Sequence, residues 1–355
     1  MRTRFGIIIT VITALVSIDT ASACTTFNLT SGDVNIYGRN YDWSVGDGAV
    51  IVNKRGLTKI AMKAKDETGQ PAKWKSKYGS ITFNQYGREF PQGGINEAGL
   101  VVEIMAVPAG EYPATDSRPY VGKAQFRQYL LDSFSTVKEV VESDSVIRVT
   151  ATGKGPMTHL LVSDRTGASA VIEFIGGKRV VYTGDSMPVR TLSNTLYADS
   201  LSHWKAKKVP TVDTWMSVER FIRAADATSS FDAKAVKAPV DHAFGLLKQV
   251  TQGDKTKWSI VYDIKNLQVF FHTSSNPKPR SIDLKKVDFS CKTPVKMVDI
   301  NGGSGDISNS FHDYTLQANR QLISDAFGKT DFLKNIPAQT IDVIAAYPDS
   351  AKCEQ

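Results

Sequence analysis

The chain has 355 residues, of which 41% are hydrophobic and 22% charged, and its formal net charge is +7. Basic and acidic residues are interspersed along the chain rather than gathered in blocks, which argues against a nucleic-acid partner. The sequence contains no dinucleotide or phosphate-loop motif and no cysteine–histidine cluster with the spacing of zinc ligands, so it predicts no cofactor and no metal.

The N-terminus has the pattern of a secretory signal peptide. Two arginines precede an uncharged apolar run of 14 residues at 5–18, and an Ala-Ser-Ala tripeptide comes directly before Cys24. The run is short for a membrane span, which needs about 20 residues, although an uncleaved anchor is an alternative. We therefore expect residues 1–23 to be a cleaved signal peptide. The mature chain would be periplasmic or secreted, without stable membrane insertion.

From residue 24 onward the sequence predicts mostly strands. In chain order the expected elements are a hairpin (25–37), strands (50–53 and 81–83), a glycine-bearing turn leading into a buried strand (93–105), a helix (123–143), a strand meander (159–184), two helices (213–226 and 239–250), a second hairpin (258–273) and a final helix (314–327). Because strands and helices each come in runs, we predict an α+β fold with antiparallel sheets. We expect one domain over 24–355, with a C-terminal extension from about 277.

The cysteine count is odd. The three cysteines are Cys24, Cys291 and Cys353. In an oxidising compartment thiols tend to pair, and an odd count leaves one over. Cys291 and Cys353 could pair and leave Cys24 free, but their spacing in the sequence does not establish the geometry of such a bond.

The predicted hairpin brings Cys24 to a Gly-Arg-Asn-Tyr-Asp-Trp segment on its second strand. A three-residue turn places Cys24 opposite Asn40, with Asp42 diagonally across on the same face. A two-residue turn places it opposite Tyr41, with Arg39 as the diagonal neighbour. The sequence leaves both registers open.

A cysteine at a new N-terminus can supply both a nucleophile and a base. Its α-amine has a pKa of about 7.7–8.0 and its thiol about 8.5, so the amine can accept the thiol proton near neutral pH. A nearby arginine such as Arg39 favours the thiolate, and an aspartate such as Asp42 can orient the amine. Signal-peptide cleavage before Cys24 would then create the base.

Other interpretations of Cys24 compete with this one. A strand cysteine is often a small buried apolar residue. A lipid-attachment cysteine would make the chain a tethered binding lipoprotein, but Ala21 at position −3 suits ordinary signal peptidase better. A papain-like site would instead pair Cys24 with a histidine, the candidates being His159, His203, His242, His272 and His312.

Several segments resemble one known family. Cys24-Thr25, followed by Gly-Arg-Asn-Tyr-Asp-Trp at 38–43, resembles the start of the choloylglycine hydrolase family. This family contains bile salt hydrolases and penicillin V acylases and belongs to the N-terminal nucleophile hydrolases. Further segments resemble family motifs in the family's order: 93–103, 159–174, 192–201, 219–225 and 261–273.

The resemblance implies a four-layer αββα fold and a role for each matched residue. Cys24 would be the nucleophile and, through its amine, the base, with Arg39 beside the thiol and Asp42 holding the amine. Asn194 would donate its side-chain amide to the oxyanion, and Arg220 would orient the asparagine and aspartate. By residue type alone, Asn194 could be a turn asparagine and Arg220 a solvent-facing helix residue.

The chain departs from the family pattern at three places. Leu196 stands where the motif has proline. Met105 and Ala106 occupy the region where bile salt hydrolases carry the residue whose backbone N–H completes the oxyanion hole. Asn194 and Arg220 are only 26 residues apart. The short spacing, with the signal peptide, resembles the Gram-negative branch of penicillin V acylases.

The resemblance also implies a substrate class and an assembly. We expect a small-molecule linear amide, such as penicillin V or a similar phenoxyacyl or fatty-acyl amide, with conjugated bile salts as the second choice. Some members of that branch also cleave acyl-homoserine lactones. We expect no cofactor and a homotetramer. Substrate loops would include the stretch after Trp43 and residues 107–120.

Overall fold

The computed structural model describes residues 24–63, 67–151, 155–207 and 216–354, so the expected signal peptide lies outside the described part of the chain. Two large sheets form its centre. The strands of the first, in spatial order, are β14 (Thr191–Leu192), β1 (Thr25–Ser31), β2 (Val34–Asp42), β15 (Thr256–Asp263), β16 (Gln268–Thr273), β17 (Arg280–Asp283) and β19 (Gly305–Asp306). Those of the second are β13 (Lys178–Thr183), β12 (Ser169–Ile175), β11 (Met157–Ser163), β8 (Val101–Val107), β7 (Gly93–Asn96), β6 (Ser80–Asn84), β3 (Ala49–Asn53), β18 (Lys296–Asp299) and β20 (His312–Asp313).

Two small sheets and the helices complete the fold. The small sheets pair β10 (Arg148–Thr150) with β9 (Tyr120–Gly122), and β4 (Leu57–Ile60) with β5 (Lys73–Lys75) and β21 (Lys352–Cys353). The helices are α1 (Phe126–Ser133), α2 (Val137–Glu142), α3 (Tyr197–Lys205), α4 (Ser217–Ser229), α5 (Pro239–Gln249), α6 (Leu316–Gly328) and α7 (Ala338–Ala346). In the described ranges, no helix is long and apolar enough to cross a membrane.

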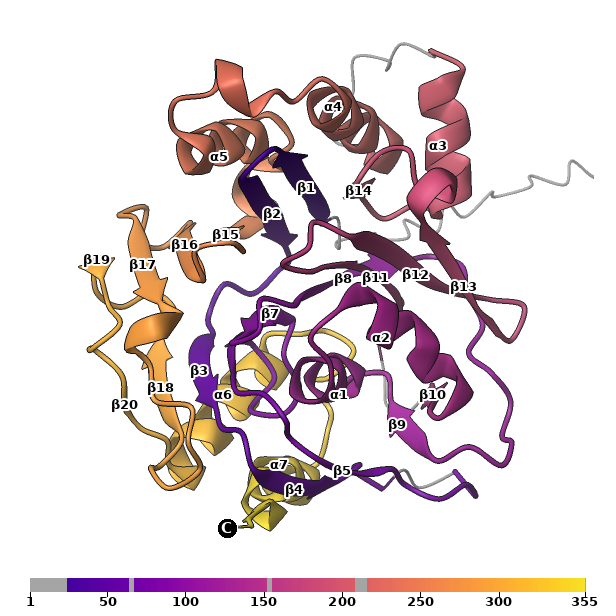
Figure 1. Cartoon of the computed structure of the whole chain (residues 1–355). Coiled ribbons are helices and arrows are strands. Elements are labelled where there is room, and N and C mark those ends of the chain that lie inside the picture. The colour runs from indigo at the N-terminus through magenta and orange to yellow at the C-terminus, as the bar shows by residue number, and fades with distance from the viewer. Residues whose placement is uncertain (1–23, 64–66, 152–154, 208–215, 355) are drawn as a thin grey trace, which may run out of the picture.

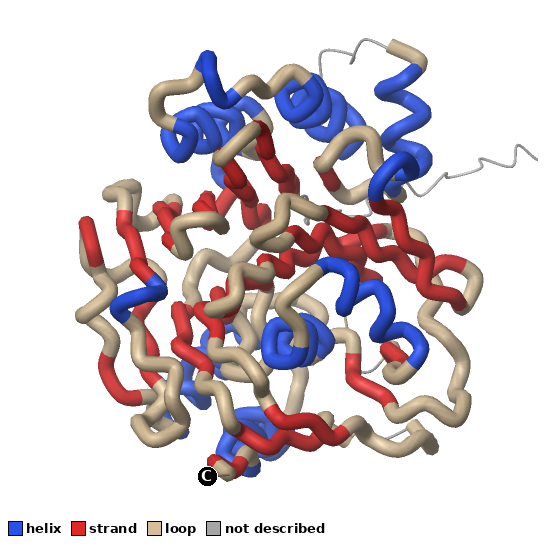
Figure 2. The backbone as a smooth tube through the Cα atoms, in the orientation of Figure 1, coloured by secondary structure: helices blue, strands red, loops and turns tan. Residues whose placement is uncertain are grey.

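The large sheets stack face to face and carry helices on their outer faces, which gives the layers of an αββα fold (Figure 1, Figure 2). Between the sheets, the Phe83 ring lies 5.3 Å from that of Phe271 and 6.2 Å from that of Tyr262, measured between centroids. Helices α4 and α5 cover the first sheet, where Phe27 packs in one cluster with Leu247. Helices α1 and α2 cover the second. The expected α+β fold with antiparallel sheets is confirmed for the two large sheets, apart from the parallel pair β17 and β19 at the edge of the first, and the small sheet of β9 and β10 is also parallel.

The first hairpin has the register of a two-residue turn. Thr25 pairs with Asn40, and the turn at 32–33 begins with Gly32 at φ +54°, a conformation that glycine adopts without strain. Cys24 directly precedes β1, so this register makes Arg39 its diagonal neighbour. The structure therefore decides between the two registers that the sequence leaves open.

Two predicted elements differ from the structure in their bounds. The helix expected over 123–143 is two helices, because Thr136 starts α2 with a capping box: its hydroxyl accepts from the Glu139 N–H at 3.2 Å, and the Glu139 carboxylate accepts from the Thr136 N–H at 3.0 Å. Within 93–105, the expected glycine-bearing turn lies at 97–98, before Gly99 at φ +89°, and it leads into β8, but Gly93–Asn96 before it form strand β7. Gly94 lies so close to the Ile81 carbonyl that a Cβ there would be 2.3 Å from its oxygen.

Helices α3 and α7 are absent from the sequence prediction, and the helix expected to be final, α6, is followed by α7. Helix α7 buries only Ile341 and Ala345, a pattern too sparse to indicate a helix. After residue 277 the chain adds β17 to the first sheet and β18 to the second. It then runs through α6 and α7 to β21, where Cys353 forms a disulfide with Cys291.

Candidate active site

Cys24 is a buried free thiol at the edge of a cavity. Its side chain is 2% exposed and takes part in no disulfide. The cavity has a volume of about 570 Å³. Hairpin β1–β2 holds Cys24 between the two large sheets, where the thiol belongs to the central hydrophobic cluster. The structure thus joins the cysteine singled out in the sequence to a space that could hold a small molecule.

Arg39 lies beside the thiol and is held from the other sheet. Its Nη2 is 3.8 Å from Cys24 Sγ. Its Nη1 donates to the Gln92 carbonyl at 2.8 Å and forms an ion pair with the Glu103 carboxylate. The Tyr262 hydroxyl donates to the other oxygen of Glu103 at 2.5 Å. Arg39 and Glu103 are both almost completely buried, so this pair fixes the guanidinium next to the thiol.

Glu103 is a site residue outside the five that the sequence predicts. It stands within the apolar Val-Val-Glu-Ile-Met run of β8. A charged residue in a strand buried on both faces needs a partner of opposite charge, and this rule is a signal that could have revealed it. That its partner is Arg39 depends on the stacking of the two sheets.

Burial dominates the electrostatics of the thiol. It raises the pKa of Cys24, and the positive charge of Arg39 opposes this effect. The charge of Asp42 adds to the rise, whereas the Asp42 backbone lowers the thiol pKa through a hydrogen bond. In this protein the arginine alone does not make the thiol acidic, so a base close to the thiol is needed for reaction near neutral pH.

Asp42 is buried with one oxygen unpaired. Its Oδ1 accepts from the Thr256 hydroxyl at 2.5 Å, whereas Oδ2 has no hydrogen-bond partner among the described residues. Burial raises the pKa of Asp42 to about 7, and the nearby Arg220 works against that rise. An unpaired buried carboxylate oxygen is unfavourable unless another donor reaches it.

Arg220 links Cys24 to Asn194. From α4 its Nη1 donates to the Cys24 carbonyl at 2.6 Å and to the Thr25 hydroxyl at 2.5 Å, and its Nη2 donates to Asn194 Oδ1 at 2.9 Å. Its side chain is fully buried. The alternative of a solvent-facing helix residue is therefore wrong for Arg220. All five residues singled out in the sequence belong to one connected cluster.

Asn194 is fixed by a loop that precedes α3. Its backbone N–H donates to the Ser217 hydroxyl at 2.9 Å, and its side-chain Nδ2 donates to the Ala106 carbonyl at 2.7 Å. Ala106 lines the cavity. A side-chain amide carries two N–H donors, so a second one remains beside the cavity wall. Leu196, in place of the family's proline, has φ −50°, within the range that proline adopts.

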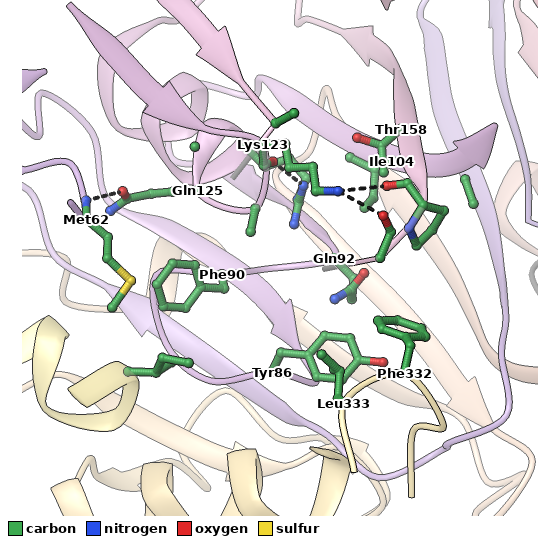
Figure 3. Close-up of a pocket in the computed structure, with 18 of the residues that line it drawn as sticks. Met62, Tyr86, Phe90, Gln92, Ile104, Lys123, Gln125, Thr158, Phe332 and Leu333 are labelled. Atoms are coloured by element: carbon green, nitrogen blue, oxygen red, sulfur yellow. Dashed lines mark hydrogen bonds between the residues drawn. The ribbon is translucent and has the colours of Figure 1, made fainter. Parts of the chain in front are cut away.

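The cavity lies between apolar surfaces from distant parts of the chain, several of which are visible in Figure 3. Its larger apolar and aromatic lining residues are Tyr41, Trp43, Met62, Tyr86, Phe90, Ile104, Phe327, Phe332, Leu333, Ile336 and Ile344. Of the two expected substrate loops, residues 107–120 do not line it. Trp43 itself does, but the stretch that directly follows it, 44–61, does not. Residues 107–120 contain contacts to β12 instead. The Tyr112 ring lies 4.7 Å from that of Phe174, and the Glu111 N–H donates to the Phe174 carbonyl at 2.9 Å.

His159 is bound by groups other than Cys24. His159 Nδ1 is 2.8 Å from Glu173 Oε1, and its Nε2 is 2.7 Å from the Ser193 carbonyl, so it supports the loop that carries Asn194. No histidine of the described chain lines the cavity with Cys24, so the geometry does not provide a papain-like pair. Within the described ranges, no group of three or more His, Cys, Asp or Glu side chains could hold a metal ion.

Comparison with solved structures defines the class of the fold. The structure matches penicillin V acylase from Agrobacterium tumefaciens with a TM-score of 0.69 and 27% sequence identity, over 82% of this chain and 98% of that one. A variant of conjugated bile acid hydrolase from Clostridium perfringens shares the fold at a TM-score of 0.64 and 18% identity, over 79% of this chain and 98% of that one. The fold is that of the N-terminal nucleophile hydrolases.

Sequence comparison then gives the family. Residues 24–216 match the family described as linear amide C–N hydrolases, choloylglycine hydrolase family. The chain is also 30% identical to penicillin V acylase from Pectobacterium atrosepticum over 259 residues, which cover 61% of this chain and 69% of that protein. The chain belongs to the choloylglycine hydrolase family of linear amide C–N hydrolases.

Proposed function

We propose that this chain is an exported amidase, similar to penicillin V acylase, that cleaves linear amides through a thioester on Cys24. The observation that carries the proposal is the buried free thiol beside Arg39 at the edge of a largely apolar cavity. Family membership supports the reaction, and similarity to two penicillin V acylases supports a phenoxyacyl substrate. The signal-peptide pattern supports export, which would place the enzyme in the periplasm or outside the cell.

In the proposed mechanism, cleavage before Cys24 frees its α-amine. The amine takes the thiol proton, and Asp42 Oδ2, which has no partner among the described atoms, accepts a hydrogen bond from the resulting ammonium. The thiolate then attacks the carbonyl carbon of the amide. The second N–H of the Asn194 side chain donates to the oxyanion, an interaction typically worth about 10²–10³ in rate.

Collapse of this intermediate breaks the carbon–nitrogen bond. The leaving amine takes the proton from the α-ammonium, and the acyl group remains on sulfur as a thioester. Water attacks the thioester and gives a proton to the α-amine. The thiolate leaves and recovers that proton, so the carboxylic acid is released and Cys24 returns to its starting state.

Intact mass and N-terminal sequencing of the exported protein test the first part of the proposal. We expect a mature chain that begins at unmodified Cys24. A diacylglyceryl adduct on Cys24 would instead identify a membrane-tethered lipoprotein and contradict the amidase.

A substrate panel tests the second part. Wild-type protein and the Cys24→Ser variant are incubated with penicillin V, glycocholate and an acyl-homoserine lactone, and the released amine is measured. We expect penicillin V to be the best of the three and Cys24→Ser to lose at least about 10³ of the activity. Preference for glycocholate would assign the chain to bile salt hydrolysis, and activity retained by Cys24→Ser would exclude the thioester.

A further inference from the structure

One wall of the cavity comes from the C-terminal part of the chain. We call α6, α7 and the loop between them, residues 316–346, the C-terminal wall. Its lining residues are Phe327, Phe332, Leu333, Ile336, Thr340 and Ile344. Figure 3 shows Phe332 and Leu333 across the cavity from Lys123 and Thr158. The wall lies outside residues 24–216, the part of the chain that matches the family model.

The C-terminal wall is fixed to the body of the protein close to the site. The Phe332 ring meets the Trp43 ring edge-on, with centroids 6.2 Å apart. Trp43 Nε1 donates to the Tyr86 hydroxyl at 2.7 Å, and that hydroxyl lies 3.2 Å from the Thr330 hydroxyl. Lys329 forms an ion pair with Asp47. These contacts join the loop between α6 and α7 to Trp43 and Asp47, which directly follow hairpin β1–β2.

Further contacts hold the two helices. Asn319 on α6 accepts from the Arg88 N–H at 2.9 Å and donates to the Ala345 carbonyl on α7 at 3.0 Å. Tyr347, directly after α7, donates to the Ile60 carbonyl at 2.6 Å. The wall therefore has a defined position relative to Cys24 and can limit the size of a ligand.

The chemistry of the C-terminal wall indicates what it contacts. Apart from the Thr340 hydroxyl, its lining side chains are apolar, and none carries a charge. Phe90 and Ile104 continue this apolar surface on the body of the protein. Lys123, a cation at the cavity, is directed to the carbonyls of Gly155 and Pro156 at 2.9 and 3.3 Å. An extended, uncharged and apolar group matches the wall, and a charged or heavily hydroxylated group does not.

We propose that the C-terminal wall binds the acyl part of the substrate and sets the length of the acyl chain that the enzyme accepts. This inference rests on the proposed amidase function. Extended aliphatic or aromatic acyl groups would contact the wall, whereas short ones would not reach it. Each methylene buried there is expected to raise kcat/KM roughly fourfold, until the cavity is full.

The test uses amides of one amine, 6-aminopenicillanic acid, with acyl groups from butanoyl to decanoyl, and measures the amine released. For the wild type we expect kcat/KM to rise with chain length. Leu333→Trp fills the space next to the wall, so it should lower kcat/KM for decanoyl at least about tenfold and change butanoyl by less than about twofold. Val343→Trp is the matched control, because Val343 lies on α7, is 64% exposed and does not line the cavity.

A second variant keeps the test decisive if Leu333→Trp does not fold. Phe332→Ala removes a side chain that is 38% exposed, so the fold should tolerate it. It should flatten the rise of kcat/KM with chain length while leaving butanoyl nearly unchanged. Equal losses for all chain lengths in Leu333→Trp, or an unaltered length profile in both variants, would overturn the proposal. A wild type inactive on every amide would instead overturn the proposed function.

Discussion

At the scale of single residues, the chemistry of the site depends on a charge pair that connects the two sheets. Arg39 comes from β2 in the first sheet and Glu103 from β8 in the second. Arg39 favours the thiolate of Cys24 against the effect of burial. Because Glu103 is paired with that guanidinium, we expect its negative charge to cancel part of the help that Arg39 gives. Glu103 thus acts as a positioning residue whose charge also limits the acidity of the thiol.

Glu103→Gln separates these two effects, because it keeps an oxygen for Arg39 but removes the charge. The thiol should become more acidic, so the rate of alkylation of Cys24 by iodoacetamide should reach half its plateau about one pH unit lower than in wild type. Tyr262→Phe is the control, since it removes the hydrogen bond to Glu103 at 2.5 Å without changing any charge. An unshifted alkylation profile in Glu103→Gln would show that the glutamate acts only through packing.

Asp42 gives a pH prediction for a chain that keeps residues before Cys24, in which the amine is blocked. Its folded pKa of about 7 lies above the ordinary value of 3.8, so the folded state binds more protons between these two pH values. Stability is then highest below the lower value and falls as the pH rises to about 7, by up to about 4 kcal/mol. Asp42→Asn should abolish this loss. Urea unfolding of both chains at several pH values would measure it, and parallel curves for the two would contradict the assignment.

At the scale of elements, the end of the chain is attached to the body by β21 and a disulfide. In β21, Cys353 lies opposite Leu57 of strand β4. Its sulfur forms a disulfide with Cys291, 62 residues earlier in the sequence. A crosslink over such a loop restricts the unfolded chain and stabilises the fold by about 4 kcal/mol in the chain-entropy description. The same bond anchors the chain just after the C-terminal wall.

The double variant Cys291→Ser/Cys353→Ser should therefore lower the free energy of unfolding by about 4 kcal/mol. Urea denaturation of wild type and variant, each with and without dithiothreitol, provides the measurement and its control. The reductant should destabilise the wild type and leave the variant unaffected. A change below about 1 kcal/mol would mean that the packing of α6 and α7 alone holds this end of the chain.

The sequence predicts the local elements of the site but not the contacts between distant elements. Alternating residues and a glycine turn are local signals, and they predict the β1–β2 hairpin that brings Cys24 to residues 38–43. They do not fix the register, so they leave open whether Arg39 or Asp42 is the diagonal neighbour of Cys24. The partners Glu103 and Arg220 come from other elements and meet the hairpin only after the layers have packed. Helix α7 was missed because its buried face is small, and the capping box at Thr136 divides a helix whose apolar pattern is continuous.

At the scale of the whole molecule, the site is the place where all parts of the chain meet. Hairpin β1–β2 supplies the thiol of Cys24, and β8 supplies the buried Glu103. Helix α4 supplies Arg220, which holds Asn194, and the C-terminal wall closes one side of the cavity. These groups are in place before any free amine is considered, and the Asp42 carboxylate still has one oxygen without a hydrogen-bond partner among the described residues. It follows that cleavage before Cys24 would add one group to a prepared site rather than reorganise the fold.

A direct comparison tests this coupling of maturation to activity and stability. One chain begins at Cys24, and the other carries Gly-Ser before it, so only the first has an amine next to the thiol. General-base catalysis contributes about 10²–10⁴ in rate, and the blocked chain should lose that much in kcat/KM on penicillin V. The chain with the free amine should also be more stable near neutral pH, because its ammonium pairs with Asp42 and removes the cost of ionising that buried carboxyl. Calorimetry of both chains, each with Cys24→Ser to prevent reaction, isolates the stability effect; equal activity in the two original chains would show that the base lies elsewhere.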